Sequence, residues 1–140
     1  MCLIKTIKIN ELKKCYITNI LKNDKVVIKI LYKELTNSFL FKKYNYYSPY
    51  EGYKYIKGKL NTSSLGIYVL TSSSTESLNI MINEGFHSFL TKEIAENYKS
   101  KLLNDSRAIL CKCIIPKGST IVYNDSEIVS NQIIFIEELK

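Results

Sequence analysis

The sequence has no tryptophan, a single arginine (Arg107) and a single histidine (His87) among its 140 residues. The lone arginine disfavours proteins that read nucleic-acid bases, because base-edge recognition relies on the bidentate guanidinium fork. A zinc site is disfavoured as well, because the chain offers only one histidine and its four cysteines lack metal-ligand spacing. We therefore expect no metal and no cofactor. Cys111 and Cys113 are expected to share one strand face as buried, reduced thiols.

Long apolar runs are also missing. Residues 1–5 begin a segment that charges interrupt every few positions, which excludes the pattern of a signal peptide or of a membrane-spanning helix. A cytoplasmic protein is the expectation. The chain shows no internal repeat, no linker and no catalytic motif, so residues 1–140 are expected to form one domain. Residues 1–24 either pack within that domain or form a separate N-terminal arm.

Lysine and tyrosine are abundant, and both gather in the first half. Residues 1–60 hold 13 lysines against four acidic residues, a net charge of +9, whereas residues 61–140 carry −2. Seven of the 11 tyrosines lie between Tyr32 and Tyr55, interleaved with lysines. Aromatic faces that stack a base, beside ammonium groups that meet phosphate, suit a nucleotide ligand. The alternatives are a solubilising lysine surface and tyrosines that serve only as strand formers.

Hydrophobic periodicity predicts several strands and one clear helix. Ile94, Ala95, Tyr98 and Leu102 recur at helical spacing after a possible cap at Thr91, so one core-facing helix is expected over residues 92–103. The expected fold class is α+β, a single domain of mainly antiparallel sheet with that one main helix. Strands are expected at residues 25–34 with a lysine-bearing outer face, 39–47 as its hairpin partner, 53–60, 65–70, 108–115 as a central strand, and 132–139.

A short stretch before the helix carries the only histidine. Gly85 suits a turn with positive φ, and Phe86 and Phe89 frame the polar pair His87 and Ser88. This arrangement predicts a binding corner. In the alternative interpretation, His87 only donates a hydrogen bond to a backbone carbonyl in the turn.

The turn formed by residues 116–119, Pro-Lys-Gly-Ser, is a second candidate for an anion contact. Lys117 and the amide of Gly118 are able to cradle a phosphate, although the spacing is not that of a Walker loop. The alternative is a simple tight turn. The hydroxyl run of residues 71–77 invites comparison with the Ser-Thr-Ser element of ADP-ribosyltransferases, but such runs more often form surface loops.

Taken together, these motifs resemble a family of small uncharacterised proteins of bacteriophages and prophages. The order of motifs is also similar to that of the unannotated domain that accompanies some pentapeptide-repeat proteins. The resemblance spans roughly residues 27–136. The motifs that carry it are the Met-Cys-Leu start, Tyr32-Lys33, Ser48-Pro49-Tyr50, Tyr53-x-Tyr55-x-x-Gly58, Glu84-Gly85-Phe86-His87-Ser88-Phe89, Cys113-Ile114-Ile115-Pro116-Lys117-Gly118-Ser119 and Glu127-Ile128-Val129-Ser130.

The resemblance implies a phage accessory protein but no specific activity. The first hypothesis is a non-catalytic counter-defence protein of the host cytoplasm. It would bind and sequester an anionic nucleotide signal, such as a cyclic oligonucleotide or a cyclised ADP-ribose derivative. The side chains expected to bind the ligand are Tyr50, Tyr53, Lys54, His87, Ser88 and Lys117.

Two hypotheses from other classes remain open. One is a protein-binding inhibitor of a host defence factor, which needs no pocket. The other is an ADP-ribosyltransferase-like enzyme, with Glu127 as the late glutamate that orients a ribose hydroxyl. Against the enzyme, His87 and Arg107 both follow the serine run, which is the wrong order for that fold.

Overall fold

The long strand β3 (Lys25–Thr36) is the centre of the fold. The protein is seen here as a computed structural model that describes residues 3–8, 18–36, 42–72 and 77–140. Along one edge of β3, the antiparallel strand β10 (Ala108–Ile115) pairs from Tyr32 to Lys25. Along the other edge, β9 (Phe86–Phe89) pairs at Ile28, and β4 (Lys43–Tyr47) pairs from Tyr32 to Thr36. That second edge therefore changes partner partway along its length.

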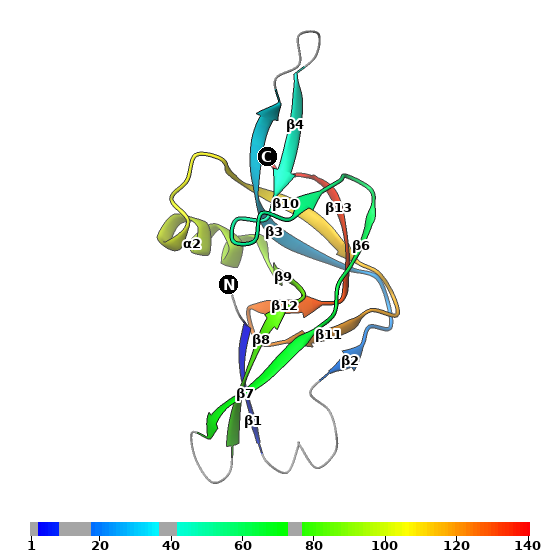
Figure 1. Ribbon diagram of the computed structural model, residues 1–140, viewed down its shortest axis with the longest axis vertical. Coiled ribbons are helices and arrows are strands. Elements are labelled where there is room, and N and C mark those ends of the chain that lie inside the picture. The colour runs from blue at the N-terminus through cyan, green and yellow to red at the C-terminus, as the bar shows by residue number, and fades with distance from the viewer. Residues whose placement is uncertain (1–2, 9–17, 37–41, 73–76) are drawn as a thin grey trace.

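The strands around β3 complete a 10-stranded antiparallel sheet, with β5 attached through β4 (Figure 1). Beyond β10 lie β13 and β6, and beyond β9 lie β12, β11 and β2. The bounds of these strands are Gln132–Glu138 for β13, Leu60–Thr62 for β6, Glu127–Ser130 for β12, Thr120–Tyr123 for β11, Asn19–Ile20 for β2 and Lys54–Tyr55 for β5.

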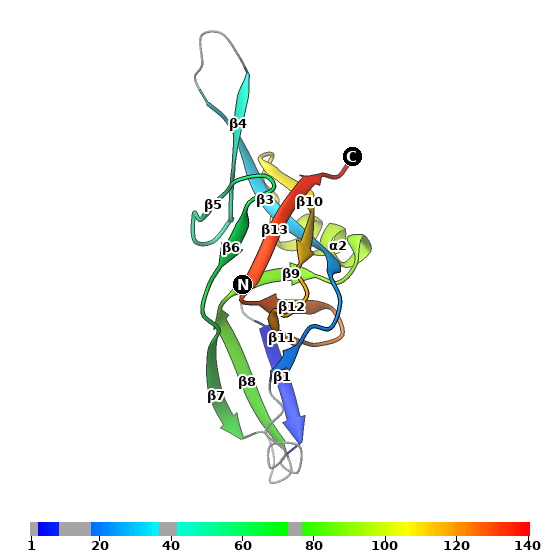
Figure 2. The same ribbon diagram turned by 90° about the vertical axis from the view of Figure 1, so that its right-hand side faces the viewer.

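A second, three-stranded sheet has the order β1-β8-β7 and bounds Leu3–Lys8, Ser77–Glu84 and Gly66–Ser72. This sheet lies at one end of the molecule, and the β3–β4 hairpin extends from the other end (Figures 1 and 2). The chain passes from the small sheet to the large one at Gly85, which has φ 125° and joins β8 to β9.

Both faces of β3 are buried from Val27 to Leu31. Val27 and Leu31 pack with Phe135 in one core cluster, while Ile28 and Ile30 pack on the other side. The second cluster includes Ala95 and Leu103, because helix α2 (Lys92–Leu102) covers that face (Figure 1). The Thr91 side chain caps α2 by accepting a hydrogen bond from the Ile94 amide, as its position predicted.

The expected α+β class is wrong, because the fold is mainly β. The described residues contain 13 strands and one helix of 11 residues, so the helix that the sequence signals most clearly stands alone. The sequence pattern did not predict the full extent of the sheet, because β9 and β12 have four residues each, too few to show a clear alternation. The expected strand 53–60 is split between β5 and β6, with Gly58 at φ 79° between them.

Several strand positions and one strand pairing were predicted correctly, although the fold class was not. Strands β10 and β13 lie where they were expected, and β4 pairs with β3 as an antiparallel hairpin partner. The start of that partner strand, residues 39–41, lies outside the described residues. Among the residues that the structure describes, no helix has both the length and the apolar character needed to span a membrane.

Candidate functional site

A cavity of about 310 Å³ opens where the edge of β3 changes partner from β9 to β4. Lys29 and Ile30 lie in this interval, between the residue paired to β9 and the first residue paired to β4. The segment from Ser48 to Tyr55 passes over the gap and supplies much of the wall. The described lining residues are Lys29, Ile30, Ser48, Pro49, Tyr50, Glu51, Tyr53, Tyr55, Thr62, Ser63, Glu84, Gly85, Phe86, His87, Phe89, Tyr98 and Leu103.

Lys29 is the buried cation of this cavity. Its side chain follows Val27 and precedes Leu31 on the same strand face, and the residue is only 7% exposed. Its Nζ donates a 2.5 Å hydrogen bond to the main-chain carbonyl of His87 and lies 5.4 Å from the centre of the Tyr55 ring. Burial lowers the pKa of Lys29 to about 8, because a low-dielectric environment disfavours the ammonium. Within the described part of the chain, no carboxylate forms an ion pair with it.

His87 lies beside Lys29 and is held neutral at ordinary pH. Burial lowers the pKa of the imidazole to about 4, and the nearby Lys29 charge adds to the effect. The Asn83 backbone acts in the opposite direction and favours the protonated ring. It forms no hydrogen bond of normal geometry with the ring, because neither ring nitrogen has a protein partner among the described residues. Both ring nitrogens are buried as well as unpaired, so they lie behind the surface of the cavity wall.

Aromatic rings form a continuous wall of the cavity. The Tyr53 ring centre lies 4.9 Å from that of Tyr55 and 5.8 Å from that of Phe86, both in edge-to-face geometry. Tyr50 and Tyr98 meet through their hydroxyl oxygens, 2.5 Å apart. Tyr50 and Tyr53 remain 55% and 41% exposed, so part of each ring is free to contact a planar ligand.

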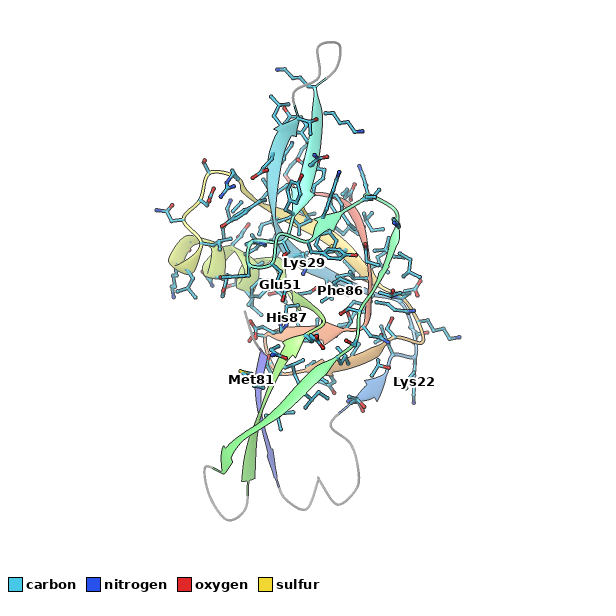
Figure 3. All side chains as sticks on the ribbon, viewed as in Figure 1. Lys22, Lys29, Glu51, Met81, Phe86 and His87 are labelled. Atoms are coloured by element: carbon cyan, nitrogen blue, oxygen red, sulfur yellow. The ribbon has the colours of Figure 1, made fainter. Side chains whose placement is uncertain are left out.

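Two carboxylates, Glu51 and Glu84, also line the cavity, and both residues are exposed. Figure 3 shows Glu51, Lys29, Phe86 and His87 grouped in the middle of the molecule. The exposed carboxylates are screened by solvent, whereas the charge of Lys29 acts in a buried environment. The cavity therefore suits a ligand with one negative charge better than a polyanion.

Three of the six predicted site residues line this cavity, namely Tyr50, Tyr53 and His87. They come together because the loop after β4 lies over β9. The sequence analysis interpreted this stretch as a corner and did not recognise it as a strand. The positive φ predicted for Gly85 is also observed. The functional role of these residues stays a prediction.

The other three predicted residues are absent from the described lining. Lys54 alternates with Tyr53 and Tyr55 along the chain, so its exposed side chain is on the opposite side from Tyr55. Ser88 is fully buried between His87 and Phe89, and its Oγ has no protein partner among the described residues.

Lys117 lies in an exposed turn between β10 and β11, outside the cavity lining. Its amide donates a hydrogen bond to Asp24 Oδ1 at 2.8 Å, and the Gly118 amide donates to the Leu21 carbonyl at 2.9 Å. The Gly118 amide proposed for the phosphate cradle is therefore already used in holding the turn, and so is the neighbouring Lys117 amide. This supports the simple-turn interpretation.

Sequence reasoning missed Lys29, the most distinctive group of the site. The expectation of a lysine-bearing outer face on residues 25–34 is wrong at this position, because β13 and β9 place core residues over both faces of β3. The signal was present: Lys29 is the one charge between Val26 and Leu31, a run otherwise apolar. Such a run is typical of a strand buried on both faces, where a lysine is exceptional.

Two further expectations concern cysteine and the hydroxyl run. Cys111 and Cys113 are free, buried thiols of β10, as predicted, and burial raises the pKa of Cys113 to about 12. Ser74 and Thr75, the core of the supposed ADP-ribosyltransferase element, lie outside the described residues. Glu127 begins β12 and is not part of the cavity lining.

Comparison with known proteins gives no relative: no family model, no curated protein and no solved structure matches the chain. The site is therefore interpreted from its own geometry.

Proposed function

We propose that this protein binds and sequesters a small anionic nucleotide, without chemical conversion, in the cavity between β3, β9 and the loop after β4. The observation that carries the proposal is the combination of partly exposed tyrosine rings with one buried ammonium, that of Lys29. Aromatic side chains stack nucleobases, and a buried cation with spare hydrogen-bond donors meets a phosphate or another single anion.

The size of the cavity narrows the ligand class. Ligand pockets in proteins commonly span about 300 to 1,000 Å³, and this cavity of about 310 Å³ is at the lower end. A mononucleotide, or part of one, fits such a volume better than a cyclic oligonucleotide. The pairing of one buried cation with two exposed carboxylates points the same way, to a phosphodiester with one negative charge.

The biological role follows from the resemblance to phage and prophage proteins. A binding protein without a catalytic constellation would act on a host nucleotide signal by mass action, lowering its free concentration in the host cytoplasm. The lysines of the first half do not gather at the cavity: of the 13, only Lys29 is among its described lining residues. The proposal therefore depends on a single cation.

A protein-binding inhibitor is the second candidate, and the β3–β4 hairpin favours it. This hairpin extends away from the body (Figures 1 and 2) and exposes the apolar side chains of Leu35 and Tyr44. If the hairpin is the functional surface, Leu35→Lys abolishes the counter-defence phenotype while nucleotide binding, if any, is unchanged.

Calorimetric titration tests the nucleotide proposal directly. We expect binding of a cyclic mononucleotide such as cyclic AMP, which carries one negative charge, and weak or no binding of the larger cyclic di-AMP. Tyr53→Ala should reduce affinity by at least about fivefold, because one stacked base contributes roughly 1–3 kcal/mol. Lys54→Ala is the matched control, since the adjacent side chain is outside the cavity lining. Absence of binding across a panel of purine and pyrimidine nucleotides would overturn the proposal.

A further inference from the structure

Lys29 has features that a structural lysine does not need. It sits inside the main cavity, is 7% exposed, and forms no ion pair with a described carboxylate. Its Nζ is held at one point by the His87 carbonyl, 2.5 Å away. An amine fixed by one hydrogen bond in this way keeps its other positions free toward the cavity.

Burial increases the share of the neutral Lys29 amine, although the ammonium remains the major form at neutral pH. The groups that act on Lys29 are Glu51 from the loop after β4, Cys111 and Cys113 from β10, and His87 from β9. Both thiols are protonated at neutral pH, because burial raises their pKa values. His87 is uncharged, because its pKa is lowered to about 4. Glu51 alone carries a charge that favours the ammonium, and burial outweighs it, leaving the pKa of Lys29 at about 8.

We propose that Lys29 is a nucleophilic lysine that captures an aldehyde-bearing ligand in the cavity as an imine. The inference rests on the proposed function in that it uses the same cavity as the ligand site, but it adds a covalent step. The ligand class is a planar or sugar-like aldehyde with one negative charge, such as an aldehyde that carries one carboxylate.

The step balances without an oxidant or a reductant. The neutral Lys29 amine attacks the carbonyl carbon, a C–N bond forms, and the carbonyl π electrons move to oxygen. A proton passes from nitrogen to that oxygen and gives the carbinolamine. The C–O bond then breaks with release of one water molecule, and the C=N bond of the imine remains. Buried amines with lowered pKa perform this chemistry because more of the free amine is present near neutral pH.

Reductive trapping with 4-formylbenzoate, a small planar aldehyde with one carboxylate, tests the inference on the intact protein. The protein is incubated with this probe and cyanoborohydride near neutral pH, then digested and mapped by mass spectrometry. We expect one carboxybenzyl group per chain, on Lys29, gained at least about tenfold faster than on exposed lysines whose pKa is ordinary. Modification spread over the exposed lysines, with Lys29 unlabelled, would overturn the inference.

Two variants sharpen the test. Lys29→Arg keeps the charge and removes the nucleophile, so fast labelling should be lost, whereas Lys54→Arg should leave it unchanged. If Lys29→Arg does not fold, the mapping of the wild-type protein decides alone.

The two proposals fail in different ways. Nucleotide binding in the calorimeter without labelling of Lys29 removes the imine and leaves the proposed function standing. Labelling of Lys29 without nucleotide binding removes the proposed function and leaves the nucleophilic lysine. If both hold, cyclic AMP at saturation should protect Lys29 from the probe.

Discussion

The hydroxyl oxygens of Tyr50 and Tyr98 lie 2.5 Å apart and join the loop after β4 to helix α2. Both residues line the cavity, so this hydrogen bond connects two of its walls. Burial raises the pKa of Tyr98, and the bond with Tyr50 adds to the shift, so the Tyr98 hydroxyl remains protonated. Release of a bound ligand by movement of the loop would have to break this contact.

Removing the Tyr98 hydroxyl should therefore speed ligand release. Tyr98→Phe keeps the ring, which packs on Phe89, and should lower the free energy of unfolding by no more than about 1 kcal/mol. The dissociation rate should rise about fivefold, which corresponds to about 1 kcal/mol. Stopped-flow displacement measures the rate, and Tyr44→Phe in the distant hairpin is the control. Equal dissociation rates for wild type and Tyr98→Phe would contradict a closing role.

Replacing Lys29 by an apolar side chain should make the protein more stable and less functional. Protonation of Lys29 is disfavoured in the folded state, where burial lowers its pKa to about 8 from the ordinary lysine value of 10.5. The difference corresponds to about 3 kcal/mol at neutral pH. Lys29→Met removes this cost but leaves the His87 carbonyl without its donor, so we expect a net gain of about 1 to 2 kcal/mol and loss of nucleotide binding.

The pH dependence of the free energy of unfolding distinguishes removal of the Lys29 charge from a change in packing alone. Because the folded pKa of Lys29 is the lower one, the unfolded chain binds more protons between pH 8 and 10.5. Wild-type stability should therefore gain from Lys29 as pH rises through that window, and the advantage of Lys29→Met should shrink. Urea unfolding at both ends of the window measures this. An advantage that stays constant would show that Lys29 is not a buried cation.

Gly85 is required where the chain passes from β8 to β9. A Cβ added there would lie 2.6 Å from both Leu65 Cδ2 and Val129 Cγ1, and φ is +125°. We expect Gly85→Ala to cost about 2 to 4 kcal/mol through strain and overpacking together. Gly118→Ala is the matched control, because Gly118 also has positive φ but its added Cβ would meet nothing within 4 Å. Equal thermal shifts for the two variants would contradict the steric argument.

Long periodic segments of this chain could be predicted from sequence, and short ones could not. Helix α2 and strand β10 lie where their patterns placed them, because each is long enough to show its period. Strand β9 has four residues and was interpreted as a corner. It forms a strand because β12 pairs with it along its whole length, a contact 38 or more residues away that no local pattern reports.

The site was half predictable for a related reason. Tyr50, Tyr53 and His87 could be identified from residue type and local framing. Lys29 was missed because local alternation treats a lysine as an outward residue, although its place in an otherwise apolar run indicated a strand buried on both faces. Lys117 was predicted as a ligand contact from a turn that resembles an anion site. In the structure, the amides of Lys117 and Gly118 donate hydrogen bonds to Asp24 and Leu21.

His87 should resist protonation and make the fold sensitive to acid. Burial and the Lys29 charge lower the pKa of His87 to about 4, below the ordinary histidine value of 6.5. The unfolded chain therefore binds more protons between these values, so the contribution of His87 to stability is complete above pH 6.5 and is lost as pH falls toward 4. Between pH 7 and pH 5 the loss should be about 1 to 2 kcal/mol, allowing for partial exposure of the ring. His87→Leu should lose this pH dependence of stability while retaining that of the carboxylates.

Because the chain has one histidine, its imidazole carbon-bound proton gives an unambiguous NMR titration. A midpoint near 6.5 would show that the ring is open to solvent and would remove His87 from the buried wall of the cavity.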